Sequence, residues 1–159
     1  LIPYGEDWRR GGEYLKQVLA DIGIQVELRY EDVPTWLKRI YHRYDFQMNL
    51  NYFYQLPDPV LGVHRHYGTD QIRKGTHFVN SSRYSNPKLD ALLDSGAGEP
   101  NAAKRTAAYK EIQQILANDM PVVNLFELEF LVVYNTKLKG VYGSAMGAYG
   151  SFREGYLDD

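Results

Sequence analysis

Residues 81–126 contain the pattern that most restricts how this chain can fold. Asn86, followed by proline, is typical of the N-cap and first turn of a helix, and the leucines after it lie at helical spacing. Asn101 is placed to cap a second, longer amphipathic helix, which stops at an Asp-x-Pro sequence beginning at Asp119. Residues 122–134 are then rich in β-formers. The order predicts two packed helices that lead into a buried strand.

The beginning of the chain predicts a helix followed by a strand. Residues 6–22 place apolar side chains on one helical stripe, and Gly23 is suited to end that helix. Residues 24–30 alternate apolar and polar side chains, which is typical of a half-buried strand.

A second helix and strand follow directly. Asp32 is a good N-cap for a helix over residues 33–44, and residues 46–54 again alternate as a strand does. A strand, helix, strand order implies a right-handed crossover and parallel pairing. We therefore expect an α/β fold with a mixed, mainly parallel sheet flanked by helices.

Composition excludes several classes of protein. A formal net charge of -2 argues against a nucleic-acid partner, which requires a basic face. The absence of cysteine excludes disulfides, thiolate metal sites and thiol catalysis. Phosphate-binding and nucleophile-elbow motifs are absent as well. The chain begins at Leu1 without an initiator methionine or signal peptide, so we expect it to be part of a longer protein.

A set of short motifs, in this order and at compatible spacing, resembles one known family. The motifs are Tyr44-Asp45-Phe46, Asp58-Pro59, Asn80, Tyr84, Asn86-Pro87, Asp90, Arg105, Tyr109 and Asp119-x-Pro121. Together they resemble the family 5 extracellular solute-binding proteins, the dipeptide, oligopeptide and nickel class of ABC importers.

The resemblance implies a two-lobed binding protein that closes around a ligand and delivers it to an ABC permease in the membrane. It implies no enzyme activity, no cofactor and no metal site, and it implies a monomer. Residues 1–137 would form most of the second lobe, and residues 138–159 a Gly- and Tyr-rich tail returning toward the first. The location would be periplasmic or extracellular, with a lipid anchor as one option in the full-length protein.

The candidate ligand-binding residues follow the second predicted strand. Tyr52, Tyr54 and Gln55 lie at its carboxyl end, where open α/β sheets bind ligands, and Asp58 follows in a turn. Packing explains the tyrosines equally well, and an Asp before Pro more often bonds its own backbone. Peptide-binding members of the family often carry an acidic residue at the Gln55 position. Glutamine cannot neutralise an α-ammonium group, so peptides, opines, sugars and metal chelates all remain open as ligands.

Two alternatives use other side chains. A small hydrolase would use the carboxylate pair Glu127 and Glu129, although their alternation with apolar residues also fits a solvent-facing strand. A metal site would use His64, His66 and His77, but no further ligand lies at a diagnostic spacing.

Three arginines could bind a ligand carboxylate through their guanidinium groups, although surface charge explains them more simply. They are Arg65, Arg73 and Arg83.

Overall fold

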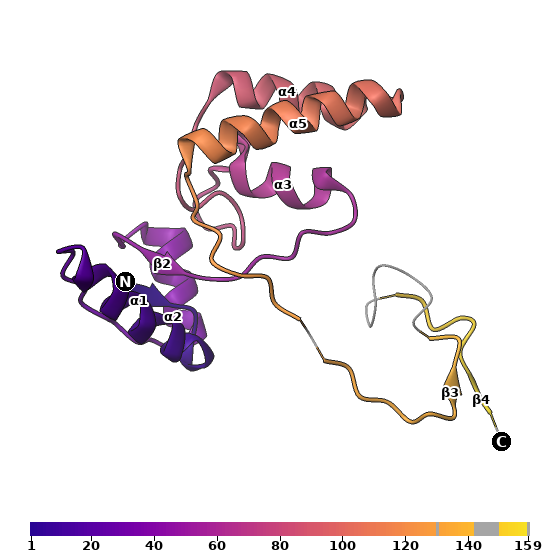
Figure 1. The fold of residues 1–159 in the computed structure, drawn as a ribbon, viewed down its shortest axis with the longest axis horizontal. Coiled ribbons are helices and arrows are strands. Elements are labelled where there is room, and N and C mark those ends of the chain that lie inside the picture. The colour runs from indigo at the N-terminus through magenta and orange to yellow at the C-terminus, as the bar shows by residue number, and fades with distance from the viewer. Residues whose placement is uncertain (130, 142–149, 159) are drawn as a thin grey trace.

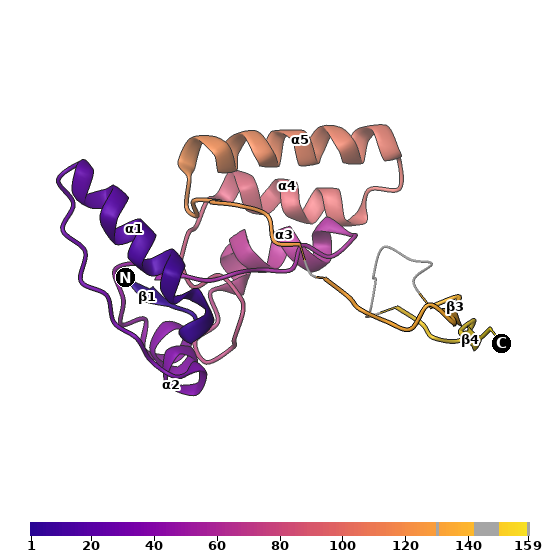
Figure 2. The same ribbon diagram turned by 60° about the horizontal axis from the view of Figure 1, so that its bottom comes forward.

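The computed structural model describes residues 1–129, 131–141 and 150–158. Figures 1 and 2 show two groups of elements joined by an extended connection, followed by a long extended segment. The first group holds α1, α2 and a small sheet, and the second holds α3, α4 and α5. No helix in the described part has the length and apolar character needed to cross a membrane.

The first group contains both helices predicted from residues 1–50. Its elements are β1 (Ile2–Pro3), η1 (Glu6–Trp8), α1 (Arg9–Asp21), α2 (Val33–Leu37), η2 (Lys38–Arg43) and β2 (Asn49–Leu50). Gly23 follows α1 with a φ of +83°, a left-handed conformation that glycine adopts without strain. Asp32 caps α2 by accepting a hydrogen bond of 2.7 Å from the Thr35 backbone N–H. Both helices and both end signals are confirmed.

The sheet is parallel, as predicted, but far shorter than predicted. β1 pairs with β2 in the register Ile2 to Asn49 and Pro3 to Leu50. The prediction of a strand over residues 24–30 was wrong: the described structure forms no strand between α1 and α2. That segment exchanges two hydrogen bonds with Leu1: Arg29 N–H donates to Leu1 O at 3.1 Å, and the Leu1 amino group donates to Glu27 O at 2.8 Å, which is too little for a ladder. The strand predicted over residues 46–54 is reduced to β2 because only β1 lies beside it.

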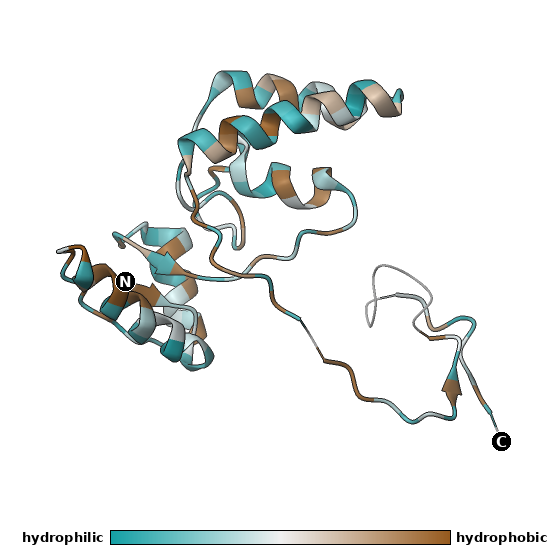
Figure 3. Ribbon diagram, in the orientation of Figure 1, coloured by the Kyte–Doolittle hydropathy of each residue, from teal (hydrophilic) through white to brown (hydrophobic). Residues whose placement is uncertain are grey.

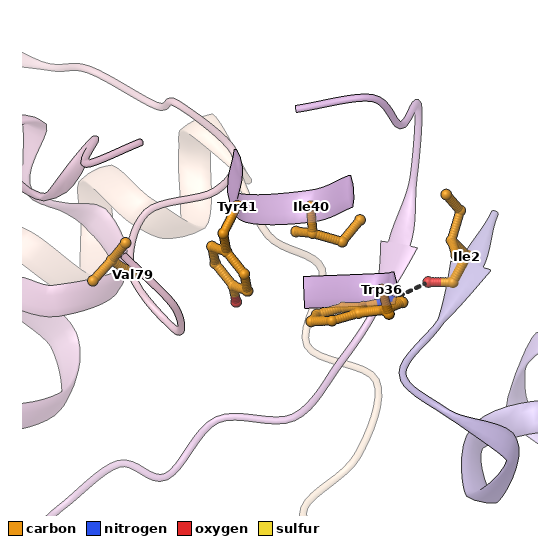
Figure 4. Close-up of a cluster of buried hydrophobic side chains, with 5 residues drawn as sticks. All are labelled: Ile2, Trp36, Ile40, Tyr41 and Val79. Atoms are coloured by element: carbon orange, nitrogen blue, oxygen red, sulfur yellow. Dashed lines mark hydrogen bonds between the residues drawn. The ribbon is translucent and has the colours of Figure 1, made fainter. Parts of the chain in front are cut away.

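The core of the first group joins the sheet to α2 and η2. Figure 4 shows its buried side chains, Ile2, Trp36, Ile40, Tyr41 and Val79. Trp36 is fully buried, and its indole N–H donates to the Ile2 carbonyl at 3.1 Å. The bond satisfies the indole's one polar group, so the ring can fill the core without a desolvation penalty.

The second group packs three helices around its own core. Its elements are α3 (Pro59–Tyr67), η3 (Thr69–Gln71), α4 (Pro87–Gly98) and α5 (Ala102–Asp119). Asn86 and Asn101 each accept hydrogen bonds from two backbone N–H groups, which confirms both predicted caps. α4 continues through Gly96 to Gly98. Gly96 lets α4 and α5 approach closely, because a Cβ there would lie 3.3 Å from the Tyr109 ring.

The chain after α5 is extended and exposed. In the described residues, the strand predicted over residues 122–134 is not formed, and Figure 3 shows apolar residues along this segment. Leu131 is 93% exposed and Val133 is 96% exposed. β3 (Leu138–Lys139) and β4 (Tyr156–Leu157) then pair antiparallel. Of the predicted tail, residues 142–149 and 159 lie outside the described residues, and the boundary at residue 137 stays a prediction.

Candidate functional site

The predicted ligand-binding residues lie in the connection between β2 and α3, where the two groups of elements meet. Tyr52 and Asp58 are half-buried, whereas Tyr54 is 37% exposed and Gln55 is exposed. Four residues from one short segment therefore divide into two that face solvent and two that contact the protein behind them.

An aromatic stack supports Tyr52. The Trp8 ring lies between Tyr52, at 5.7 Å and 10° between planes, and Phe126, at 6.0 Å and 17°. Tyr54 meets Tyr52 edge-on at 5.6 Å. Trp8 and Phe126 were not predicted as part of this region, because they come from chain segments far from residue 52. Aromatic character was their only signal in the sequence.

Gln55 is held by α3. Its side-chain Nε2 lies 3.3 Å from His66 Nδ1, at hydrogen-bond distance. His66 is only 3% exposed, and its ring lies 3.8 Å from the Phe53 ring. Burial, assisted by the nearby Arg65 charge, lowers the pKa of His66 to about 3. The residue that fixes Gln55 is therefore a neutral imidazole at physiological pH.

Asp58 has two structural partners. It caps α3 by accepting from the Val60 N–H at 2.9 Å, and Arg105 Nη2 donates to its two oxygens at 2.8 and 3.0 Å. The Val60 bond, and after it the Arg105 guanidinium, hold the pKa of Asp58 below its usual value. Arg105 also donates from Nε to the Gly96 carbonyl at 3.1 Å, so the pair ties the start of α3 to both α4 and α5.

The other motif residues that carry the family resemblance also hold the second group together. Asn80 donates to the carbonyls of Gly68 and Tyr84 at 3.0 and 2.8 Å. Asp90 accepts from the Thr69 N–H at 2.9 Å. The Tyr84 hydroxyl donates to Asp119 at the end of α5. These residues stabilise the second group, and the segment with Tyr54 and Gln55 packs against it.

The three histidines of the metal hypothesis are not brought together. His64 faces Asp70 and Asp94 at 3.5 and 3.9 Å, and His66 faces Gln55. His77 instead meets His42, with 3.1 Å between their Nε2 atoms. No cluster of three or more metal-ligating side chains exists among residues 1–129, 131–141 and 150–158.

The carboxylate pair of the hydrolase hypothesis is in open solvent. Glu127 and Glu129 are both exposed on the extended segment after α5. General acid catalysis by a carboxyl group needs burial or a close charge to shift its pKa, and within the described chain neither residue forms an ion pair. The geometry gives these residues no catalytic environment.

The three candidate arginines differ in their surroundings. Arg73 lies 3.6 Å from Asp70, and Arg83 lies over the Tyr44 ring at 5.2 Å. Arg65 donates from Nη2 to the Tyr54 carbonyl at 3.3 Å, and its Nε is buried without a hydrogen-bond partner. Of the three, Arg65 is the one in direct contact with the candidate ligand-binding segment.

A surface hollow of about 360 Å³ lies away from these residues. It is at the edge of the first group and is lined by Leu1, Ile2, Glu27, Arg29, Tyr44, Asp45, Phe46 and Gln47. The candidate segment contributes no side chain to it. Tyr54 and Gln55 thus form an open surface in the described part of the molecule.

Comparison with known proteins shows which class of fold this is. No family model matches the chain. The peptide transport periplasmic protein SapA of Haemophilus influenzae is 24% identical over 145 residues, which cover 86% of this chain and 24% of that protein. The chain therefore spans about a quarter of that relative's length.

Several solved structures share the fold, and two of them, each with a TM-score of 0.71, show what kinds of protein they are. One is the ABC transporter-associated periplasmic binding protein DppA of Helicobacter pylori with the peptide STSA, 20% identical, covering 99% of this chain and 31% of that one. The other is NikZ of Campylobacter jejuni with Ni(L-His), 21% identical, covering 87% of this chain and 27% of that one.

These matches define the class of fold: the chain has the α/β fold of periplasmic binding proteins. The resemblance predicted from the motifs, to the family 5 solute-binding proteins of ABC importers, is confirmed: the chain is similar over most of its length to periplasmic peptide- and nickel-binding proteins.

Proposed function

We propose that the chain is part of the substrate-binding component of an ABC importer. The longer protein would hold a peptide-like or other small polar solute between two lobes and deliver it to a membrane permease. The names of its relatives support this: one is a peptide transport periplasmic protein, and solved structures hold a peptide and a nickel–histidine complex. The proposed protein is a monomer in the periplasm or outside the cell, with a lipid anchor as an option, and makes or breaks no bond.

One observation carries the proposal. The segment from Tyr52 to Asp58 presents Tyr54 and Gln55 to solvent on a rigid support of stacked rings, a buried imidazole and an ion pair. Preorganised polar and aromatic groups are what a binding site requires. We assign ligand contact to Tyr52, Tyr54 and Gln55. Asp58 belongs to the site as the residue that positions the segment.

The site is half of a cleft in this proposal. The candidate surface is open, and relatives are about four times as long as the region matched here. Residues 1–137 would supply one wall, and residues 138–159 would reach toward the lobe that supplies the other. The 159-residue chain alone should therefore bind its solute weakly, because half of the contacts are missing.

The experiment is to produce the longer protein in a bacterial periplasm, unfold it, and identify released small molecules by mass spectrometry. A defined peptide, opine, sugar or metal chelate would support the proposal. Its affinity, measured by calorimetry, should fall with Tyr54→Ala and not with Tyr14→Ala, a matched control at an exposed tyrosine of α1. Turnover of a substrate that is lost in a Glu127→Gln, Glu129→Gln variant would contradict it.

A further inference from the structure

Arg65 is an arginine without a counterion beside the candidate ligand-binding segment. It lies in the last turn of α3 and is half-buried, and its Nη2 donates to the Tyr54 carbonyl at 3.3 Å. The Nε–H, on the same edge of the guanidinium as Nη2, is buried and has no hydrogen-bond partner. This edge of the group therefore lies against the protein and the Tyr54 backbone, and a solute would bind through the Nη1 and Nη2 end.

Other partly buried arginines of the described chain are paired with carboxylates. Arg39 pairs with Glu31 at 2.6 Å and Arg105 with Asp58 at 2.8 Å. No ion pair formed by the described residues involves Arg65. The carboxylate nearest to it in this segment, Asp58, is already bound to Arg105 and to the α3 backbone.

A half-buried charge with no counterion is unfavourable until an anion binds. The planar guanidinium group offers parallel N–H donors that match a carboxylate, and such charge-assisted pairs are stronger than neutral hydrogen bonds. Gln55, next to Tyr54 in the same segment, is neutral and adds no negative charge beside Arg65.

We infer that the solute carries a carboxylate that binds Arg65 next to Tyr54. This inference rests on the proposed function and specifies its ligand class: an anionic end of the solute, and not an ammonium end, is recognised by this lobe. The probe is a random tripeptide mixture prepared both with free C-terminal carboxylates and as C-terminal amides.

The longer protein is incubated with both mixtures, and captured peptides are quantified by mass spectrometry. The wild type should enrich the free acids by about tenfold or more. Arg65→Gln should abolish this preference, and Arg65→Lys should restore part of it. Arg73→Gln, which removes the same charge from an exposed arginine paired with Asp70, should keep it. Equal capture of acids and amides by the wild type would overturn the inference and leave the binding function intact.

If no peptide is captured, a second measurement tests the carboxylate site at Arg65 separately from the proposed peptide binding. That outcome would count against peptide transport, and titration of the chain with acetate would then decide the role of Arg65. A saturable shift of the Arg65 Nε–H signal in NMR spectra, absent for Arg73, supports a carboxylate site. A shift that does not saturate, or that is equal at both arginines, overturns it.

Discussion

The Gln55 side chain lies directly against Gly62 of α3, where a Cβ would be 2.4 Å from Gln55 Oε1. Gly62→Ala should therefore push the amide away from His66. Alanine favours a helix over glycine by about 1 kcal/mol, which offsets the crowding, so we expect the free energy of unfolding to change by no more than about that amount. The distinctive result should be a shift of the His66 imidazole signals in NMR spectra.

Gly98→Ala is the matched control for that substitution. Gly98 ends α4 with open space around its Cβ position, so alanine there should stabilise slightly and leave the His66 signals unchanged. Unchanged His66 signals in Gly62→Ala would show that Gly62 does not position Gln55.

The buried imidazole of His66 should make stability depend on pH. Burial lowers the pKa of this histidine from 6.5 to about 3, so between these values the unfolded chain binds a proton that the folded chain does not. The contribution of the neutral imidazole to the free energy of unfolding is fully present above pH 6.5. It is lost as pH falls toward 3, by an amount of the order of a few kcal/mol. His66→Phe, which keeps a ring against Phe53, should flatten the urea-unfolding profile across this range. His64→Gln should not, and equal slopes in all three proteins would refute the prediction.

The two roles of Asp58 can be separated by substitution. Asparagine is a good helix cap but carries no charge, so Asp58→Asn should lose only the attraction to Arg105. Asp58→Ala should lose the cap to Val60 as well, and should lower the melting temperature further. Double-mutant cycles with Arg105→Met should give similar coupling energies for Asp58→Asn and Asp58→Ala, because both variants lose the same ion pair with Arg105. Identical melting temperatures for the two Asp58 variants would exclude the capping role.

Helix ends were predictable because their signals are local. Asp32, Asn86 and Asn101 bond to backbone groups two or three residues away, so the sequence around each cap is sufficient. Strands were not predictable in this way, because a strand forms only where a second strand pairs with it. Residues 24–30 have the alternation of a strand, yet the described chain places little beside them to complete a ladder.

The candidate site was predictable only in part for the same reason. Tyr54 and Gln55 followed from their place after a predicted strand. The contacts of His66 with Gln55, and of Phe126 with Trp8, depend on how distant segments pack, which no local pattern specifies. The isolation of Arg65 depends on where every carboxylate lies, so it could be recognised only in three dimensions.

The part of the extended segment around Leu131 should contribute little to the stability of this chain. Leu131 is 93% exposed, so Leu131→Ser should change the free energy of unfolding by less than about 0.5 kcal/mol. It should reduce binding of a hydrophobic dye, because exposed apolar surface is removed. Leu89 is fully buried between α4 and its neighbours, and Leu89→Ala should cost about 2–5 kcal/mol. A large loss of stability in Leu131→Ser would mean that the segment packs against the protein in solution.

A carboxylate at position 55 should change both the pKa of His66 and the ligand preference of the longer protein. Gln55→Glu places a negative charge close to His66 Nδ1, now 3.3 Å from the glutamine amide, and an adjacent anion favours the protonated imidazole. The pKa of His66 should rise above its present value of about 3, which an NMR titration of the ring signals measures directly. The same charge should increase the affinity of the longer protein for peptides with a free amino end relative to N-acetylated peptides. Gln55→Met, which is similar in size and neutral, should do neither. An unshifted His66 titration in Gln55→Glu would mean that the side chain at position 55 points away from α3.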